Sequence, residues 1–261
     1  MNDSYARFVQ LRHSLANCRA GASDSGQTFT LGAKVVDARL GGGLLRSALH
    51  EIYAAQAGDM VAANGFALML ALRARGVAAG KPILWLRGDR AMRRHGRIYG
   101  PGLVELGADP DQFWLISAPD DLALLRAAGD AIGCAGLGTL ILEIGGKARL
   151  LDLTATRRLA LGAARSGVMA LLIRSEAQPV PSAATTRWQV AAAPSQPLAA
   201  NAPGHPCLAV SLLRHRSGRP GFETIMEWNR DEQSFRETPL YCPVPAAAPG
   251  GQAQAAWRLA S

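Results

Sequence analysis

Residues 50–76, HEIYAAQAGDMVAANGFALMLALRARG, have the layout of a phosphate-binding loop. A short β-branched and aromatic run precedes a loop of small residues, and an apolar helix follows the loop. In a working loop of the form G-x-x-x-x-G-K-[ST], backbone N–H groups and the lysine bind the phosphates, and the hydroxyl holds Mg²⁺. The stretch therefore raises the question of whether this protein binds a nucleotide.

The polar residues that such a loop needs are missing here. No lysine occurs in residues 35–80, and no serine or threonine follows Ser47 within the loop or the helix. Asp59 stands where the helix should begin, so we expect its carboxylate to cap the helix N-terminus and to take the position that a phosphate would use. The sequence predicts a degenerate phosphate loop, at Ala54, Gly58 and Asp59, that binds no cofactor.

Two further strands lack the usual catalytic acids. The strand ILWLRG ends in Arg87 and Gly88, where an NTPase of this type carries an activating glutamate. The strand TLILEIGG carries Glu143 where an aspartate normally organises Mg²⁺. Glu143 could ligate a metal, but without the lysine we interpret it as a structural acid. The four cysteines are scattered without metal-ligand spacing, and we expect neither catalysis nor a metal site.

Hydrophobic periodicity predicts an α/β fold. The expected strands are residues 48–53, 82–88, 112–118, 138–146 and 168–175, and the expected helices are residues 60–75, 120–133 and 153–166. This alternation predicts a mainly parallel, twisted sheet with helices on both faces. A further strand is expected at residues 186–194, and antiparallel strands within residues 207–237, joined at HRSGRPG.

The chain divides into three parts. Residues 1–28 contain an amphipathic helix with Tyr5, Phe8, Leu11 and Leu15, followed by a polar linker. Residues 29–238 form the α/β domain. Residues 239–261 are rich in proline, alanine and glycine and predict a flexible tail, in which Trp257 and Leu259 could anchor a partner or serve no function.

The composition is basic, with a formal net charge of +8. A basic surface favours polyanionic partners, but only three of the 28 basic residues are lysines, and a GC-rich coding sequence would also raise arginine content. The N-terminal residues lack the apolar stretch of a signal peptide, and no apolar run is long enough to cross a membrane. We therefore expect a cytoplasmic protein.

One dense arginine cluster stands out. RGDRAMRRHGR contains Arg87, Arg90, Arg93, Arg94 and Arg97, and on a helix several of these side chains would share a face. Such a cluster either contacts DNA or an acidic protein, or is simply a solvated face. A second, weaker candidate is the expected hairpin tip, with Arg214 and Arg216.

Two segments carry a resemblance to a known family. FTLGAKVVDARLGGGLLRSALHEIY resembles the beginning of a RecA core, in which an LD…LGGGL pattern precedes the strand that leads to the phosphate loop. The segment IYGPGLVELGADPDQFWLI resembles the next part of RecA. With the lysine-free loop and WLRGD, residues 29–237 resemble the ImuA family, small RecA-like proteins of bacterial damage-induced mutagenesis cassettes.

The resemblance implies a non-catalytic accessory subunit of an SOS-induced translesion DNA synthesis complex, acting at the nucleoid. The implied partners are an ImuB-like, inactive relative of Y-family polymerases and an error-prone DnaE-type polymerase, with RecA and DNA as further candidates. The segments after the fourth and fifth expected strands are short, which argues against an active recombination filament. The N-terminal helix lies where the self-docking helix of RecA lies, so it would contact RecA or a second copy of the chain, unless it folds onto its own core.

Two other functions stay open. A divergent DNA-dependent ATPase of the RecA type would need a non-standard phosphate loop. The SulA-like inhibitors of the division protein FtsZ are also RecA-shaped proteins without a working nucleotide site.

Overall fold

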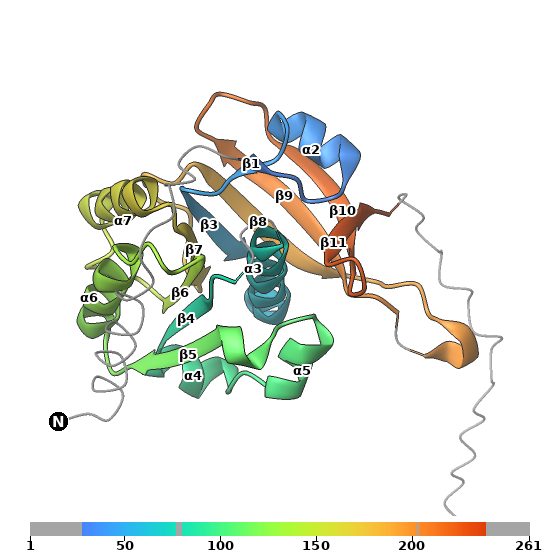
Figure 1. Cartoon of the computed structure of the whole chain (residues 1–261), viewed down its shortest axis with the longest axis horizontal. Coiled ribbons are helices and arrows are strands. Elements are labelled where there is room, and N and C mark those ends of the chain that lie inside the picture. Colours follow the sequence, from blue (N-terminus) through green and yellow to red (C-terminus); the bar gives the residue numbers. More distant parts are fainter. Residues whose placement is uncertain (1–27, 77–79, 203, 239–261) are drawn as a thin grey trace, which may run out of the picture.

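The computed structural model describes residues 28–76, 80–202 and 204–238. In this part of the chain, nine strands form one mixed sheet, flanked by helices (Figure 1). The expectations for the N-terminal helix (Tyr5, Phe8, Leu11, Leu15) and for the tail (Trp257, Leu259) lie outside the described residues.

The parallel half of the sheet closely follows the expected alternation of strands and helices. Its strands are β3 (Leu49–Ala54), β4 (Ile83–Gly88), β5 (Phe113–Ala118), β6 (Thr139–Gly145), β7 (Met169–Ser175) and β8 (Thr186–Ala193). The long helices between them are α3 (Met60–Arg75), α6 (Asp121–Ile132) and α7 (Leu153–Ser166). Asp120 and Asp152 begin α6 and α7 by accepting hydrogen bonds from the N–H groups of Ala123 and Ala155.

The remaining strands and short helices complete the fold. They are β1 (Thr28–Phe29), α2 (Lys34–Leu40), β2 (Leu44–Leu45), η1 (Ala57–Asp59), α4 (Asp89–His95), α5 (Gly100–Glu105), η2 (Pro110–Gln112), η3 (Ala199–Asn201), β9 (Cys207–His215), β10 (Phe222–Asn229) and β11 (Ser234–Glu237). The sequence patterns did not predict α2 and α5, which are too short to show a helical period.

The strand order is β11-β10-β9-β8-β3-β7-β6-β4-β5. The six strands from β8 to β5 pair in parallel, and β9, β10 and β11 extend the sheet in antiparallel fashion. The predicted hairpin at HRSGRPG is confirmed, because β9 and β10 pair across it. The fold is therefore α/β with a mostly parallel, mixed sheet, as expected.

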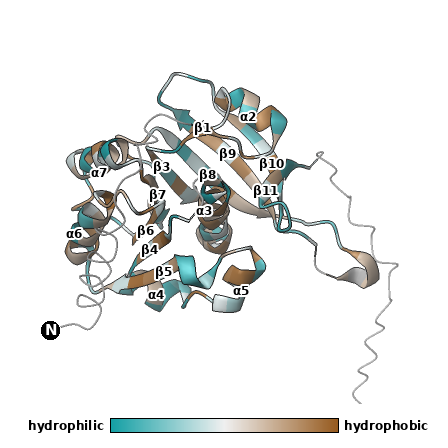
Figure 2. Ribbon diagram, viewed as in Figure 1, coloured by the Kyte–Doolittle hydropathy of each residue, from teal (hydrophilic) through white to brown (hydrophobic). Residues whose placement is uncertain are grey.

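Two hydrophobic cores lie on opposite faces of the sheet. Side chains alternate along each strand, so Ile141 of β6 packs with the α3 core while Leu140 and Leu142 pack with the α6 and α7 core. The central strands β4, β6 and β7 are largely hydrophobic in Figure 2. Helices covering both faces explain these continuous apolar runs.

Helix α3 is the most deeply buried helix of the described part. Its buried residues are Met60, Ala62, Ala63, Phe66, Ala67, Leu68, Met69, Leu70, Ala71, Leu72 and Ala74, which form far more than one stripe. An aromatic cluster beside it joins Phe66, Trp188 and Phe235 with ring centroids 5.7 Å apart in both Phe66 pairs. A helix that is apolar around most of its circumference is typical of such a buried position.

The VDARLGGGL segment forms α2 and the turn after it. Asp37 binds the N–H groups of Leu31 and Gly32 at 2.7 and 3.0 Å, which fixes the chain before the helix. Gly41 ends α2 in the left-handed conformation, at φ 80°. At Gly43, also with positive φ, a Cβ atom would lie 2.1 Å from the Phe29 carbonyl oxygen, so only glycine fits.

Candidate functional site

The loop between β3 and α3 is the site that the sequence singles out. The chain leaves β3 at Ala54, makes one 3-10 turn over Ala57–Asp59, and begins α3 at Met60. None of residues 55–59 has a positive φ, so their N–H groups do not form the alternating nest that binds phosphates. The N–H of Ala55 donates to Val190 and that of Asp59 to Gln56. The strand–loop–helix layout is thus present, and two of its loop N–H groups already donate to protein carbonyls.

Asp59 does not cap α3, and that prediction is wrong. The residue occupies the N-cap position, but its side chain accepts no hydrogen bond from the helix. Instead, Oδ1 accepts from the N–H of Ala192 in β8 at 3.0 Å. Strand β8 continues past the end of β3. The carbonyl of Val190 in β8 accepts a hydrogen bond from the N–H of Ala55, and the N–H of Ala192 points to the same side of β8. Asp59 therefore takes the place of a strand partner for β8.

The carboxylate of Asp59 nevertheless stays at the loop. Its side chain is buried, and Oδ2 has no hydrogen-bond partner within the described residues. A phosphate placed at the start of α3 would face this acid, and residues 54–60 offer it no cation. The local electrostatics therefore oppose binding of a triphosphate at this helix terminus.

Arg87 and Glu143 neutralise each other near the carboxyl ends of β4 and β6. The two residues are direct neighbours in the strand register. Arg87 donates from Nε to Oε2 of Glu143 at 2.5 Å and from a terminal nitrogen to Oε1 at 3.2 Å. A third bond runs to the carbonyl of Gly96 at 3.0 Å, and both side chains are almost fully buried. Such a two-pronged pair satisfies both charges and leaves Glu143 engaged with arginine.

The structure divides the predicted arginine cluster. Arg87 is excluded from surface contacts by its burial. Arg97 does not share a helix face with the others, because α4 ends at His95 and the chain leaves the helix at Gly96, which has a positive φ of 76°. Arg90, Arg93, Arg94 and Arg97 are exposed, and we call these four residues the α4 cluster. Arg94 pairs with Glu176 across the end of β7.

Arg90, Arg93 and Arg97 are the members of the α4 cluster that stay open. All three are exposed, and within the described ranges no salt bridge to any of them is present. These arginines of the α4 cluster are therefore available to bind an anionic partner. They lie on a surface close to the carboxyl edge of the sheet.

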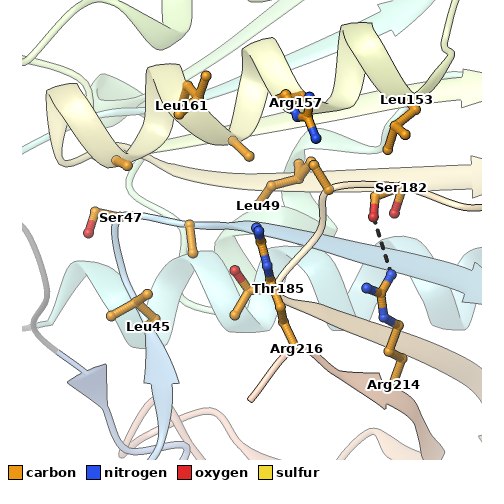
Figure 3. Close-up of a pocket in the computed structure, with 14 residues that line it drawn as sticks. Leu45, Ser47, Leu49, Leu153, Arg157, Leu161, Ser182, Thr185, Arg214 and Arg216 are labelled. Atoms are coloured by element: carbon orange, nitrogen blue, oxygen red, sulfur yellow. Dashed lines mark hydrogen bonds between the residues drawn. The ribbon is translucent and has the colours of Figure 1, made fainter. Parts of the chain in front are cut away.

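Arg214 and Arg216 lie beside a groove that the sequence patterns did not reveal. The groove has a volume of about 380 Å³ and lies between α7, the start of β3, the segment before β8 and the end of β9 (Figure 3). Arg157 of α7 joins the two arginines there. No sequence signal links α7 to the hairpin, because the two lie far apart in the chain and meet only through the sheet topology.

A buried polar chain supports the same end of β3. Nε2 of His50 lies 2.8 Å from the carbonyl oxygen of Leu45, which can only accept, so Nε2 carries the proton. Nδ1 then accepts from the hydroxyl of Thr186 at 2.7 Å, and that hydroxyl accepts from the indole of Trp188 at 2.8 Å. Burial lowers the pKa of His50 from 6.5 to about 4, so the ring is neutral near pH 7. His50 is thus a packing histidine.

The described residues show neither a metal-ligand cluster nor a membrane-spanning helix. No group of three or more His, Cys, Asp or Glu residues within them could hold a metal ion. None of the helices in the described ranges is both long and apolar enough to cross a membrane.

Comparison of the chain with protein-family models and with curated proteins gives no match.

Proposed function

We propose that this protein is a non-catalytic, ImuA-like accessory subunit of an SOS-induced translesion DNA synthesis complex. It binds an ImuB-like, inactive Y-family polymerase relative, and through that complex it serves an error-prone DnaE-type polymerase at the nucleoid. RecA and DNA are further candidate partners. The proposal joins the sequence resemblance to the geometry around the β3–α3 loop.

The ion pair of Arg87 and Glu143 is the observation that carries the non-catalytic part of the proposal. In an ATPase of the RecA type, the corresponding strand ends hold Mg²⁺ and activate water. Here one of the two positions has become a cation, and the other is bound to it at 2.5 Å. Releasing Glu143 for a metal would leave a buried, unpaired guanidinium, which costs about 3–5 kcal/mol.

The arrangement of the fold supports a RecA-like assignment. The degenerate loop follows β3, a strand flanked by β7 and β8 within the sheet, and it leads into the buried helix α3. The connections after β6 and β7, where RecA carries its DNA-binding loops, are short in this chain. The connection after β7 is also held against α7, because the N–H of Ala183 donates to the hydroxyl of Thr156.

Co-purification with the polymerase subunits tests the proposal directly. The full chain, the ImuB-like protein and the DnaE-type polymerase are produced together, and the complex is isolated through a tag on the ImuB-like protein. We expect stoichiometric recovery of this chain, unchanged when ATP is omitted. Loss of recovery without ATP would instead support the divergent ATPase. Recovery with FtsZ in a parallel experiment, and not with the ImuB-like protein, would support a SulA-like inhibitor.

The α4 cluster provides a separate test of DNA contact. Binding to single-stranded DNA is measured over a range of salt concentrations for the native chain and for Arg90→Ala/Arg93→Ala. Each lost phosphate contact should lower the slope of log K against log salt by about 0.7 for a single strand. The matched control is Arg126→Ala/Arg165→Ala, which removes two exposed arginines from α6 and α7. Equal slopes for all three proteins would assign Arg90 and Arg93 to solubility alone.

A further inference from the structure

The groove beside α7 combines an apolar surface with three arginines. Its apolar residues include Leu45 of β2, Leu49 at the start of β3, and Leu153 and Leu161 on α7. Leu153 and Leu161 are 47% and 50% exposed, so both are accessible to a ligand in the groove. The groove lies away from the β3–α3 loop, at the opposite end of β3.

The charges of the groove are all positive. The residues that line it include Arg157, Arg214 and Arg216 but no aspartate or glutamate. Arg214 donates to the carbonyl oxygen of Ser182 at 3.2 Å, which leaves its charge uncompensated. In the described part of the chain, no salt bridge involves any of these three side chains.

The arginines also converge. Arg157 reaches from α7 toward the sheet, and Arg214 and Arg216 reach from β9 and its turn toward α7, so their guanidinium groups face the same space (Figure 3). Like charges held around one cavity raise its potential and favour an anion within it. Arginine forms two parallel hydrogen bonds with a carboxylate, and such pairs are among the strongest in proteins.

The chemistry of the groove favours a peptide over a nucleic acid. Proteins that bind single-stranded nucleic acids commonly stack the bases on aromatic side chains, and the lining residues include no Phe, Tyr or Trp. Exposed leucines contribute little to phosphate binding, but they fit the aliphatic side chains of a protein segment. A volume of about 380 Å³ lies within the range of small binding pockets and suits a few side chains of an extended segment.

We propose that this groove binds an acidic segment of a partner protein, with Asp or Glu side chains on Arg157, Arg214 and Arg216 and aliphatic side chains on Leu153 and Leu161. The site is independent of the proposed role in DNA synthesis, because it is defined by its lining residues alone. It would therefore stand if the polymerase partners proved wrong.

Selection from a displayed library of random peptides tests this proposal. The full native chain is immobilised, and bound peptides are counter-selected on the charge-reversed variant Arg157→Glu/Arg216→Glu. We expect the surviving peptides to be enriched in Asp and Glu together with Leu, Ile or Phe. In fluorescence anisotropy, a selected peptide should bind the charge-reversed variant at least tenfold more weakly, and Arg157→Ala/Arg216→Ala should show a smaller loss.

The matched control is Arg126→Glu/Arg158→Glu, which makes the same charge change on α6 and on another face of α7, outside the groove lining. Its affinity for the peptide should stay within twofold of the native value, and thermal melting of each variant verifies the fold. The proposal is overturned if no peptide prefers the native chain, if the selected peptides lack acidic residues, or if the control loses as much affinity. Binding of a (dT)₂₀ oligonucleotide that depends on Arg157 and Arg216, without peptide binding, would assign the groove to nucleic acid.

Discussion

Arginine side chains have opposite surroundings at the two ends of the parallel strands. Near the carboxyl ends of the strands, Arg87 is buried and its charge is matched by Glu143. At the amino end of β3, Arg157, Arg214 and Arg216 surround a groove that has no carboxylate in its lining. The Arg87–Glu143 pair is closed to an added anion, and the groove is open to one.

This difference indicates which surfaces of the molecule can bind an anion. In open parallel sheets, ligands bind outside the carboxyl ends of the strands, and here this end is occupied by the protein's own ion pair and by Asp59. Within the described residues, exposed arginines without a salt bridge include Arg90, Arg93 and Arg97 of the α4 cluster, on the surface beside this edge, and those of the groove at the amino end of β3. A fold with the layout of a nucleotide-binding protein thus presents these charges outside the β3–α3 loop.

The largest effect on stability is expected when the buried Arg87–Glu143 pair is broken. Replacing Glu143 by Gln leaves the buried guanidinium of Arg87 without its counter-charge, so we expect unfolding free energy to fall by about 3–5 kcal/mol in urea titration. The double variant Arg87→Leu/Glu143→Leu removes both charges and should cost less than Glu143→Gln alone. A loss below about 1 kcal/mol for Glu143→Gln, as expected for an exposed pair, would contradict the description of Arg87 and Glu143 as a buried, mutually neutralised pair.

A large effect of pH on stability is expected from His50, near the amino end of β3. The lowered pKa of His50, about 4 against 6.5 when unfolded, means that the unfolded chain binds a proton first as the pH falls. Stability is therefore full above pH 6.5 and decreases toward pH 4, by about 3 kcal/mol at 1.36 kcal/mol per pH unit. Urea titrations across this window measure it.

The variant His50→Gln isolates this contribution from that of other titrating groups. It should be less stable at neutral pH, and its stability should vary less between pH 6.5 and 4 than that of the native chain. Parallel pH curves for the two proteins would show that His50 does not titrate in this window.

An intermediate effect is expected at the β3–α3 loop. Replacing Asp59 by Ala removes the acceptor for the N–H of Ala192, and losing this part-buried hydrogen bond costs about 0.5–1.5 kcal/mol. Asp59→Asn keeps an oxygen acceptor and should cost less. Amide hydrogen exchange at Ala192 should accelerate in Asp59→Ala relative to Asp59→Asn, and equal rates would refute the bridging role of Asp59.

The smallest effect is expected on the surface. Arg94 pairs with Glu176, but the Arg94 side chain is 60% exposed. Replacing Arg94 by Ala should therefore change unfolding free energy by less than about 1 kcal/mol. The comparison with Glu143→Gln separates a buried charge pair from an exposed one at the same edge of the sheet, and a similar loss for both variants would remove that distinction.

Much of the parallel half of the fold could be predicted from the sequence. Helices α3 and α7 begin and end at the expected residues, and the strands differ by one or two residues at most. Long helices with clear boundaries and apolar strand runs carry strong local signals. Helices α2 and α5 do not, because helices of seven and six residues are too short for a period to show.

The site could be predicted only in part, because its contacts join distant segments. The missing lysine and the acid at Asp59 are visible locally, but the bond from Asp59 to Ala192 depends on how far β8 extends past β3. The sequence pattern groups Arg87 with the neighbouring arginines of RGDRAMRRHGR. In the fold, Arg87 lies in a strand covered on both faces and is the register partner of Glu143. Arg157 carried no signal, because α7 meets the β9 hairpin only in three dimensions.

The central claim is that the loop between β3 and α3 offers a triphosphate no cation and faces it with the carboxylate of Asp59. Isothermal titration of the full chain with ATP and Mg²⁺ tests this claim most directly. We predict no heat beyond dilution at millimolar nucleotide. A saturating isotherm with a micromolar dissociation constant would contradict the claim, and with it the proposed non-catalytic role.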